Sequence, residues 1–249
     1  MIDILAIAPH PDDAEIFCGG LLAKAALAGK KTAIIDLTRG ELSSNGDIET
    51  RAAEAEKASI ALKLSTRINL GLPDGALNAT GGIASEQIAT LVDAFRSLKP
   101  QLVLIPFLGE GRHPDHKSAG ELATQAAFFA TLKKFKANKN LAPHTIGMLL
   151  QYQMRFSFKP SFVIDVTACY DIKRIAISCY HSQVQQKNNS SATLINAPLS
   201  LSSIEARDKY YGAMIGTGYG EAYYSESMLS IEDPLAIINS NSSFLFPGE

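Results

Sequence analysis

The chain has 249 residues, with 23 lysines and arginines against 25 aspartates and glutamates, so its formal charge is −2. A hydrophobic content of 46% and a charged content of 19% exclude a disordered chain. The near-neutral charge argues against a nucleic-acid partner, because such binders usually carry a strong basic excess. No run of 18 apolar residues is present, which argues against a membrane association. Three widely spaced cysteines form no disulfide framework, so we expect a reduced, cytoplasmic protein.

Apolar runs and helical stretches alternate along the chain. Buried strands are predicted over residues 2–8, 32–37, 66–70, 101–105, 146–152 and 162–166. Helices are predicted over residues 15–28, 50–62, 85–98, 116–133, 171–182 and 202–215, with Gly29 ending the first, Thr50 capping the second and a capping box at Ser202 and Glu205 starting the last. This alternation indicates an α/β protein with a mostly parallel sheet covered by helices on both faces.

No internal repeat or sharp shift in composition divides the sequence. We therefore expect residues 1–249 to form a single domain, a Rossmann-like three-layer sandwich with its active site at the carboxyl ends of the strands. The polar stretch over residues 183–200 is too long for an ordinary connection, and we interpret it as a flexible flap, a loop or an oligomer contact.

Two polar segments each follow a predicted strand. The first is A-P-H-P-D-D-A-E and the second is G-R-H-P-D-H, and together they hold three of the five histidines. Because the carboxyl ends of parallel strands share one edge of a sheet, the two segments are expected to lie close together. Their chemistry-bearing residues are His10, Asp12, Asp13 and Glu15 in the first segment, and Arg112, His113, Asp115 and His116 in the second.

Either segment alone is compatible with a solvated turn that caps the following helix. Together they offer two imidazoles and a carboxylate, with acid–base groups left over, which is the inventory of a catalytic metal site with an open position. Such ligands favour Zn²⁺, while Fe²⁺, Mn²⁺ and Co²⁺ are also compatible. No G-x-G-x-x-G follows the first strand and no G-x-S-x-G is present, so dinucleotide-binding and serine-hydrolase signatures are missing. Cys18 is interpreted as a small core residue.

The paired motifs H-P-D-D and H-P-D-H resemble those of the LmbE-like, or PIG-L, family of zinc-dependent N-deacetylases, and the resemblance extends across most of the chain. D-L-T-R-G-E-L-S-S-N-G (residues 36–46), Y-H-S-Q (residues 180–183) and Y-G-E-A-Y (residues 219–223) are similar to the bacillithiol-biosynthesis branch. That branch removes the acetyl group from N-acetylglucosaminyl-malate.

The resemblance implies a role for each motif residue. His10, Asp13 and His116 would hold the metal, and Asp12 would be the general base. His113 would polarise the acetyl carbonyl and protonate the leaving amine, while Asp115 would orient one imidazole.

The resemblance also implies a small amino-sugar substrate and a homo-oligomer, either a trimer or a hexamer. For a malate conjugate, Arg51 and Arg112 are the expected partners of the two carboxylates, with Arg39 a weaker third, and Asn45 is expected to bind sugar hydroxyls.

Two alternatives stay open at this point. The chain could deacetylate another N-acetylglucosamine conjugate, such as a chitooligosaccharide, or it could be a non-catalytic module that binds a sugar or a nucleotide. Asp12 favours catalysis, because a binder needs no second carboxylate beside the ligand.

Overall fold

The computed structural model of the protein describes residues 1–109, 112–184 and 200–231. Of the flap predicted over residues 183–200, residues 185–199 lie outside the described residues. The described part of the chain forms a seven-stranded sheet in the order β3-β2-β1-β4-β5-β7-β6. β7 runs antiparallel to both its neighbours, and all other strand pairs are parallel, which confirms the predicted α/β architecture. The strands are β1 (Ile4–Ala8), β2 (Thr32–Thr38), β3 (Thr66–Leu72), β4 (Leu102–Pro106), β5 (Met148–Tyr152), β6 (Phe162–Asp165) and β7 (Gly220–Tyr224).

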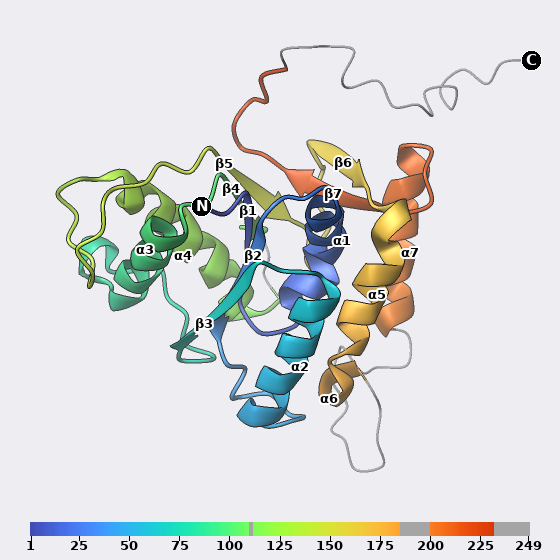
Figure 1. The fold of residues 1–249 in the computed structure, drawn as a ribbon, viewed down its shortest axis with the longest axis horizontal. Helices are drawn as coiled ribbons and strands as arrows, with labels where there is room; N and C mark the ends of the chain where they lie inside the picture. The colour runs from blue at the N-terminus through green and yellow to red at the C-terminus, as the bar shows by residue number, and fades with distance from the viewer. Residues whose placement is uncertain (110–111, 185–199, 232–249) are drawn as a thin grey trace, which may run out of the picture.

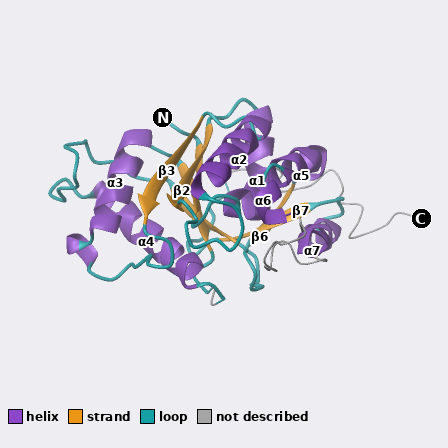
Figure 2. Ribbon diagram, turned by 90° about the horizontal axis from the view of Figure 1, so that it is seen from below, coloured by secondary structure: helices purple, strands orange, loops and turns teal. Residues whose placement is uncertain are grey.

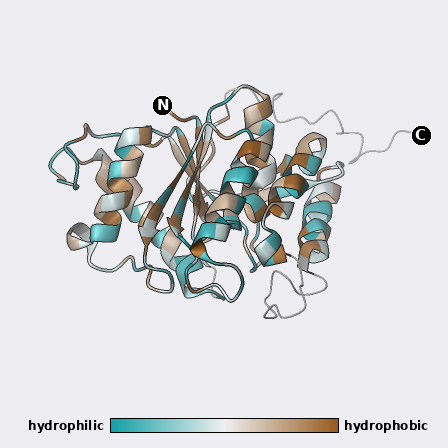
Figure 3. Ribbon diagram, turned by 60° about the horizontal axis from the view of Figure 1, so that its bottom comes forward, coloured by the Kyte–Doolittle hydropathy of each residue, from teal (hydrophilic) through white to brown (hydrophobic). Residues whose placement is uncertain are grey.

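Helices cover both faces of the sheet (Figures 1 and 2). α3 and α4 pack together on one face, while α1, α2 and α5 pack on the other, and α7 lies against β6 and β7. Each face has its own hydrophobic cluster of buried side chains. Figure 3 shows the hydrophobic strands between these two helical layers. The helices are α1 (Asp13–Leu27), α2 (Ile48–Ala61), α3 (Glu86–Leu98), α4 (Pro114–Thr131), α5 (Tyr170–Ser178), α6 (His181–Val184) and α7 (Ser200–Met214).

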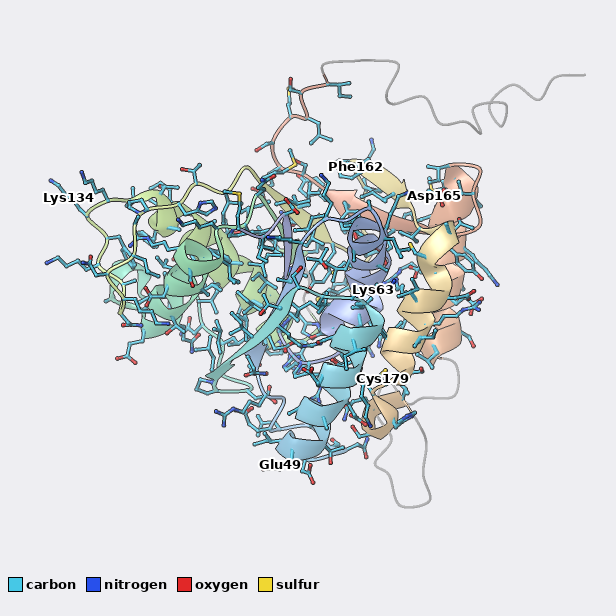
Figure 4. All side chains as sticks on the ribbon, viewed as in Figure 1. Glu49, Lys63, Lys134, Phe162, Asp165 and Cys179 are labelled. Carbon is cyan, nitrogen blue, oxygen red and sulfur yellow. The ribbon has the colours of Figure 1, made fainter. Side chains whose placement is uncertain are left out.

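The central strands are buried on both sides, as their composition predicts. Every residue of β2 is buried, and four of the five residues in both β1 and β4 are buried. At the far edge lies β6, whose ends Phe162 and Asp165 are labelled in Figure 4. Its residues are all half-buried, in keeping with its place as an edge strand.

From β1 the chain adds β2 and then β3 on one side of the sheet, and it then crosses back to add β4 on the other side of β1. β2 and β3 lie on one side of β1, while β4 and β5 lie on the other, so the sheet has a switch point where β1 and β4 are neighbours. The turns after these two strands therefore diverge and leave a crevice at the carboxyl edge, which is where open α/β sheets bind ligands.

Several element boundaries differ from the predictions. Asp47, not Thr50, caps α2, and its carboxylate accepts a 2.7 Å hydrogen bond from the Thr50 amide. The capping box expected at Ser202 is wrong, because α7 already includes Ser200. The helix expected over residues 171–182 divides into α5 and α6.

β7 was not predicted as a strand. Its first residue closes a glycine-rich segment that follows a helix, and such a segment is typical of a loop. The strand nevertheless carries a carboxylate that organises α1. α1 kinks at Cys18, where the backbone is not helical, and the Glu221 carboxylate accepts hydrogen bonds from the amides of Gly20 and Leu21, each 2.8 Å long. Glu221 therefore caps the second half of α1, and a Cβ at Gly20 would lie 2.8 Å from its Oε1 atom.

A buried lysine holds this carboxylate in place. Lys173 of α5 is fully buried, and its Nζ lies 2.7 Å from both Glu221 Oε1 and Asp208 Oδ2. Tyr223 and Tyr170 donate their hydroxyls to Glu221 and Asp208 respectively. This cluster joins α1, α5, α7 and β7 through charges that have no access to water.

Replacing Lys173 tests the importance of the cluster. We expect Lys173→Met to lower the free energy of unfolding in urea by about 3–5 kcal/mol, because two buried carboxylates lose their cation. The exposed Lys57→Met on α2 is the matched control and should change it by less than about 0.5 kcal/mol. Equal effects of the two substitutions would contradict the structural role of Lys173.

Candidate metal centre and active site

The turn between β1 and α1 has a strained backbone at Asp12. Its φ is +119°, a region that favours glycine, and it precedes α1 without capping the helix through its side chain. Arg51 of α2 supports this conformation by donating a short hydrogen bond to the Pro11 carbonyl, and its Nη2 atom lies 3.3 Å from Asp12 Oδ2. A Cβ at Gly40, where φ is +71°, would collide with the Arg51 guanidinium. The strained backbone is therefore at Asp12, next to Asp13, where the side chains of these two motif carboxylates take different directions.

His10, Asp13 and His116 converge on one point at the carboxyl edge. Oδ2 of Asp13 lies 3.1 Å from Nδ1 of His10 and 3.5 Å from Nε2 of His116. One potential ligand atom from each of the three residues lies within 4.8 Å of the other two. The structure therefore brings together the three residues that the sequence predicted as metal ligands.

His10 is held from behind by two further carboxylates. Its Nε2 atom lies 3.0 Å from Asp74 Oδ1 and 3.5 Å from Asp115 Oδ2. Asp115 is fixed in turn by the amides of Gly75 and Leu77, which donate hydrogen bonds of 2.7 and 3.2 Å. Carboxylates in this position set the orientation and tautomer of a metal-binding imidazole. Asp115 lies where the sequence placed such a group, whereas Asp74 was missed.

Asp74 was missed because it lies in a Pro-Asp-Gly turn, a common turn sequence with no catalytic signature. The available signal was its position directly after β3, at the same sheet edge as the two motifs.

The donor set and its charge fit a divalent cation. His10, Asp13 and His116 supply the two imidazoles and one carboxylate typical of catalytic zinc, and the buried Nδ1 atom of His116 has no hydrogen-bond partner among the described residues. A second trio, His10, His113 and Asp115, also has closely spaced ligand atoms. In that trio, however, backbone amides already occupy both Asp115 oxygens. The first trio is therefore the better candidate.

The electrostatics agree with this choice. Burial lowers the pKa of His10, but hydrogen bonds with Asp115, Asp13 and Asp74 outweigh it and raise that pKa well above its ordinary value. Burial raises the pKa of Asp13, but the neighbouring His116 and His10 hold it well below its usual range. The cluster thus attracts positive charge, which a metal ion would supply.

Asp12 and His113 flank the ligand cluster. Burial raises the pKa of Asp12 to about 7, against the lowering effect of Arg51. His113 precedes α4, and its Nδ1 accepts a 3.2 Å hydrogen bond from the Asp115 amide. In the neutral imidazole the proton is therefore on Nε2, which makes that atom a donor. Burial, together with the neighbouring His116 and His10, lowers the pKa of His113 and favours this neutral form.

A cavity of about 750 Å³ opens over the cluster. Among the residues predicted to contact substrate, Arg51 and Arg112 line it, although Arg51 is 4% exposed and directs Nη2 and Nη1 toward the turn carbonyls of Pro11 and Gly40. Asn45 is not among the residues lining this cavity; its carbonyl accepts hydrogen bonds from Ser43 and Gln183.

The sequence assigned no role in the site to several other residues of the cavity wall. They are Phe17, Leu42, Asp74, Arg155 and Gln183. Gln183 also accepts a hydrogen bond from the Ser43 hydroxyl, so α6 braces the loop after β2. Glu15, the remaining acid of the first motif, does not line the cavity. It is fully buried, where Arg67 and Tyr180 donate to it.

A two-histidine, one-aspartate site at the switch point of a parallel sheet is typical of a metal-dependent hydrolase. Residues 5–127 match the PIG-L family model, described as GlcNAc-PI de-N-acetylase. Diacetylchitobiose deacetylase from Thermococcus kodakarensis is 30% identical, with an alignment that covers 72% of this chain and 69% of the relative. The chain belongs to the PIG-L family of deacetylases.

Two further proteins are similar to this chain. A conserved protein from Thermus thermophilus has a solved structure that superposes with a TM-score of 0.83 and 37% identity, covering 93% of this chain and 98% of that one. A probable N-acetyl-alpha-D-glucosaminyl L-malate deacetylase from Bacillus subtilis is 27% identical, covering 73% of this chain and 83% of the relative.

Within the described residues, no helix has both the length and the apolar character needed to cross a bilayer.

Metal content tests the ligand cluster. The native protein reconstituted with Zn²⁺ should retain about one ion per chain after desalting, and His116→Ala should retain much less, because a three-ligand site loses an imidazole. His144→Ala is the control, since His144 contacts the Pro100 carbonyl instead of the cluster. Elemental analysis measures both, and equal retention by the two variants would refute the site.

The role of Asp74 behind His10 has its own test. Asp74→Asn should weaken zinc affinity by about 10- to 100-fold, because the carboxylate that orients His10 loses its charge. Competition with a chromogenic chelator measures this affinity. The control is Asp171→Asn, which removes an exposed carboxylate on α5. An unchanged affinity in Asp74→Asn would show that Asp115 alone positions the imidazole.

Proposed function

We propose that the protein hydrolyses the N-acetyl group of an N-acetylglucosamine conjugate, releasing acetate and the free amine. The observation that carries this proposal is the position of Asp12, a second buried carboxylate directly beside the candidate ligand Asp13. The family assignment and the deacetylase relatives support the same chemistry.

Three side chains would hold the metal, namely His10, Asp13 and His116. When bound there, a Zn²⁺ ion supplies Lewis acidity that activates water and polarises the acetyl carbonyl. Fe²⁺, Mn²⁺ and Co²⁺ suit the same donors.

Asp12 would act as the general base. Its carboxylate would accept the proton of the attacking water, which is the task of a general base. The Arg51 guanidinium beside Asp12 stabilises its charged form and fixes the carboxylate.

His113 would act on the acetyl group. Its Nε2–H donates a hydrogen bond to the carbonyl oxygen, where negative charge develops as the carbonyl carbon is attacked. One such donor is typically worth about 3–4 kcal/mol of transition-state stabilisation. The proton that Asp12 takes from the water would then pass to the departing nitrogen, so that the amine leaves neutral. His113 would keep its Nε2 proton, because a neutral imidazole that gave it up would become an imidazolate; it would therefore not act as the proton donor that the family resemblance implied. Asp115 would support His113 through its backbone amide and His10 through its carboxylate.

The conjugate has two candidate forms. Diacetylchitobiose deacetylase, at 30% identity, supports a chitooligosaccharide, and the malate deacetylase, at 27%, supports N-acetylglucosaminyl-malate. The expected malate clamp of Arg51 and Arg112 is weakened because the fold engages Arg51 within the Asp12 turn. The broader class of N-acetylglucosamine conjugates is therefore the proposal. A non-catalytic binding module is the remaining rival, and acetate release that a chelator abolishes would exclude it.

Asp12→Asn tests the catalytic assignment. The variant should keep its zinc but lose about 10²–10⁴-fold in kcat, because the amide cannot accept the proton of water. Acetate release from N-acetylglucosamine substrates measures the rate, and elemental analysis measures the metal. Asp171→Asn is again the control. A near-normal kcat in Asp12→Asn would remove Asp12 from the mechanism.

A further inference from the structure

A pair of carboxylates joins the loop after β2 to the turn after β3. Glu41 Oε1 accepts a 3.0 Å hydrogen bond from the Asp74 amide, and Asp74 Oδ2 accepts a 2.9 Å hydrogen bond from the Leu42 amide. Each carboxylate therefore holds the backbone of the segment that carries the other. We call this reciprocal arrangement the Glu41–Asp74 clasp, and the loop that it holds comprises residues 39–45.

The two oxygens of Asp74 have different partners. Oδ1 lies 3.0 Å from Nε2 of His10, while Oδ2 accepts the hydrogen bond from Leu42. The side chain of Asp74 is 6% exposed, so protein groups and not bulk water set its direction. Because a carboxylate is rigid and planar, a movement of the Leu42 backbone that displaces Oδ2 also displaces Oδ1 against the His10 ring. The clasp therefore reaches a candidate metal ligand through a single carboxylate.

Glu41 lies at the surface, yet two backbone amides fix its carboxylate. Oε2 accepts a 3.2 Å hydrogen bond from the Arg39 amide, while Oε1 accepts the one from Asp74. Glu41 is not among the described residues that line the main cavity or supply candidate ligand atoms. An effect of Glu41 on the metal centre would therefore be transmitted by Asp74.

The loop that the clasp holds forms part of the cavity wall. Leu42 and Ser43 line the same cavity as His10. α6 holds the loop at a second point, where Gln183 donates a hydrogen bond to the Asn45 carbonyl and accepts one from the Ser43 hydroxyl. Opening of the clasp would therefore change the cavity wall and the support of His10 together.

We propose that Glu41 is a positioning residue of the metal centre, which acts through Asp74 on His10. The formed clasp gives the carboxylate behind His10 the direction that orients a metal-binding imidazole. Metal binding in turn favours the clasp, because coupling between two equilibria is reciprocal. Occupancy of the metal centre and closure of the wall over residues 39–45 thus support each other. The inference depends on the candidate metal centre and not on the proposed deacetylase activity.

Zinc affinity tests the proposal without turnover. In competition with a chromogenic chelator, full-length Glu41→Ala should bind Zn²⁺ about three- to tenfold more weakly than the native protein, a smaller loss than the one of about 10- to 100-fold typical of a direct partner of a ligand. Glu41→Gln keeps one acceptor oxygen and should lie between these two proteins, and it serves as the second variant if the alanine variant does not fold. A native affinity in both variants would overturn the proposal.

Glu49→Ala is the matched control. It removes an exposed carboxylate from the first turn of α2, at the position labelled in Figure 4, and it should leave the zinc affinity unchanged. An equal loss in Glu49→Ala and Glu41→Ala would show a general effect of surface charge and would also overturn the proposal.

A double-mutant cycle separates positioning from a general loss of stability. If Glu41 acts through Asp74, adding Glu41→Ala to Asp74→Ala should weaken zinc binding by less than about twofold beyond Asp74→Ala alone. Losses that multiply would mean that the two residues act independently, against the proposal. With Co²⁺ in place of Zn²⁺, Glu41→Ala should alter the visible absorption bands that report ligand geometry, whereas a variant that only destabilises the fold would keep native bands in its folded fraction.

Hydrogen exchange measures the loop side of the coupling. Zn²⁺ should slow exchange of the Leu42 and Asp74 amides by about the same three- to tenfold factor, because the coupling is reciprocal. Asp74→Ala should abolish this protection at Leu42, and equal exchange with and without Zn²⁺ in the native protein would refute the coupling. If no substrate releases acetate but these differences hold, the deacetylase function fails and the positioning role stands. If acetate is released and Glu41→Ala binds Zn²⁺ normally, the positioning role fails alone.

Discussion

The imidazole of His10 is the point on which the carboxyl edge of the sheet depends. It contacts Asp13 from the start of α1, Asp74 from the turn after β3 and Asp115 from the start of α4. Three loops that leave the sheet in different directions are thereby tied to one ring. Carboxylates placed so close together repel one another unless positive charge lies among them. The repulsion among these carboxylates costs free energy when the loops come together. It also makes this edge of the sheet a favourable site for a cation.

The strained turn directs two adjacent carboxylates to different partners. Asp12 and Asp13 are adjacent in sequence, yet Asp13 faces the histidines while Asp12 lies beside Arg51. The positive φ of Asp12 separates the two side chains. A relaxed backbone at this position would change the relative direction of the ligand and the proposed base. Arg51 supports the strained turn from outside the motif, through its hydrogen bond to the Pro11 carbonyl and its contact with Asp12.

The sequence was sufficient to predict site residues where a motif of chemically reactive side chains follows a stretch whose apolar pattern predicts a buried strand. His10, Asp13 and His116 were predictable because two histidine-containing motifs follow buried strands whose carboxyl ends share one sheet edge, and because the paired motifs resemble those of a known family of deacetylases. Asp74 was not, since an acid in a Pro-Asp-Gly turn has no pattern that separates it from ordinary surface acids. Glu221 lies in the Y-G-E-A-Y motif, but that motif indicated only a family likeness and gave no sign that the carboxylate caps a helix. Arg51 shows a third limit. Its residue type indicated anion binding, but burial among the carbonyls of Pro11 and Gly40 is a tertiary property that a linear sequence does not display.

The cap that Glu221 places on α1 has a consequence for the order in which the protein forms. All three candidate metal ligands lie within the first 116 residues, but the carboxylate that satisfies the Gly20 and Leu21 amides comes from residue 221. A chain emerging from the ribosome therefore contains the complete ligand set long before the helix that presents Asp13 can be completed. Closing so long a loop is entropically costly and slow. The second half of α1 therefore lacks its cap until the chain has been synthesised as far as Glu221.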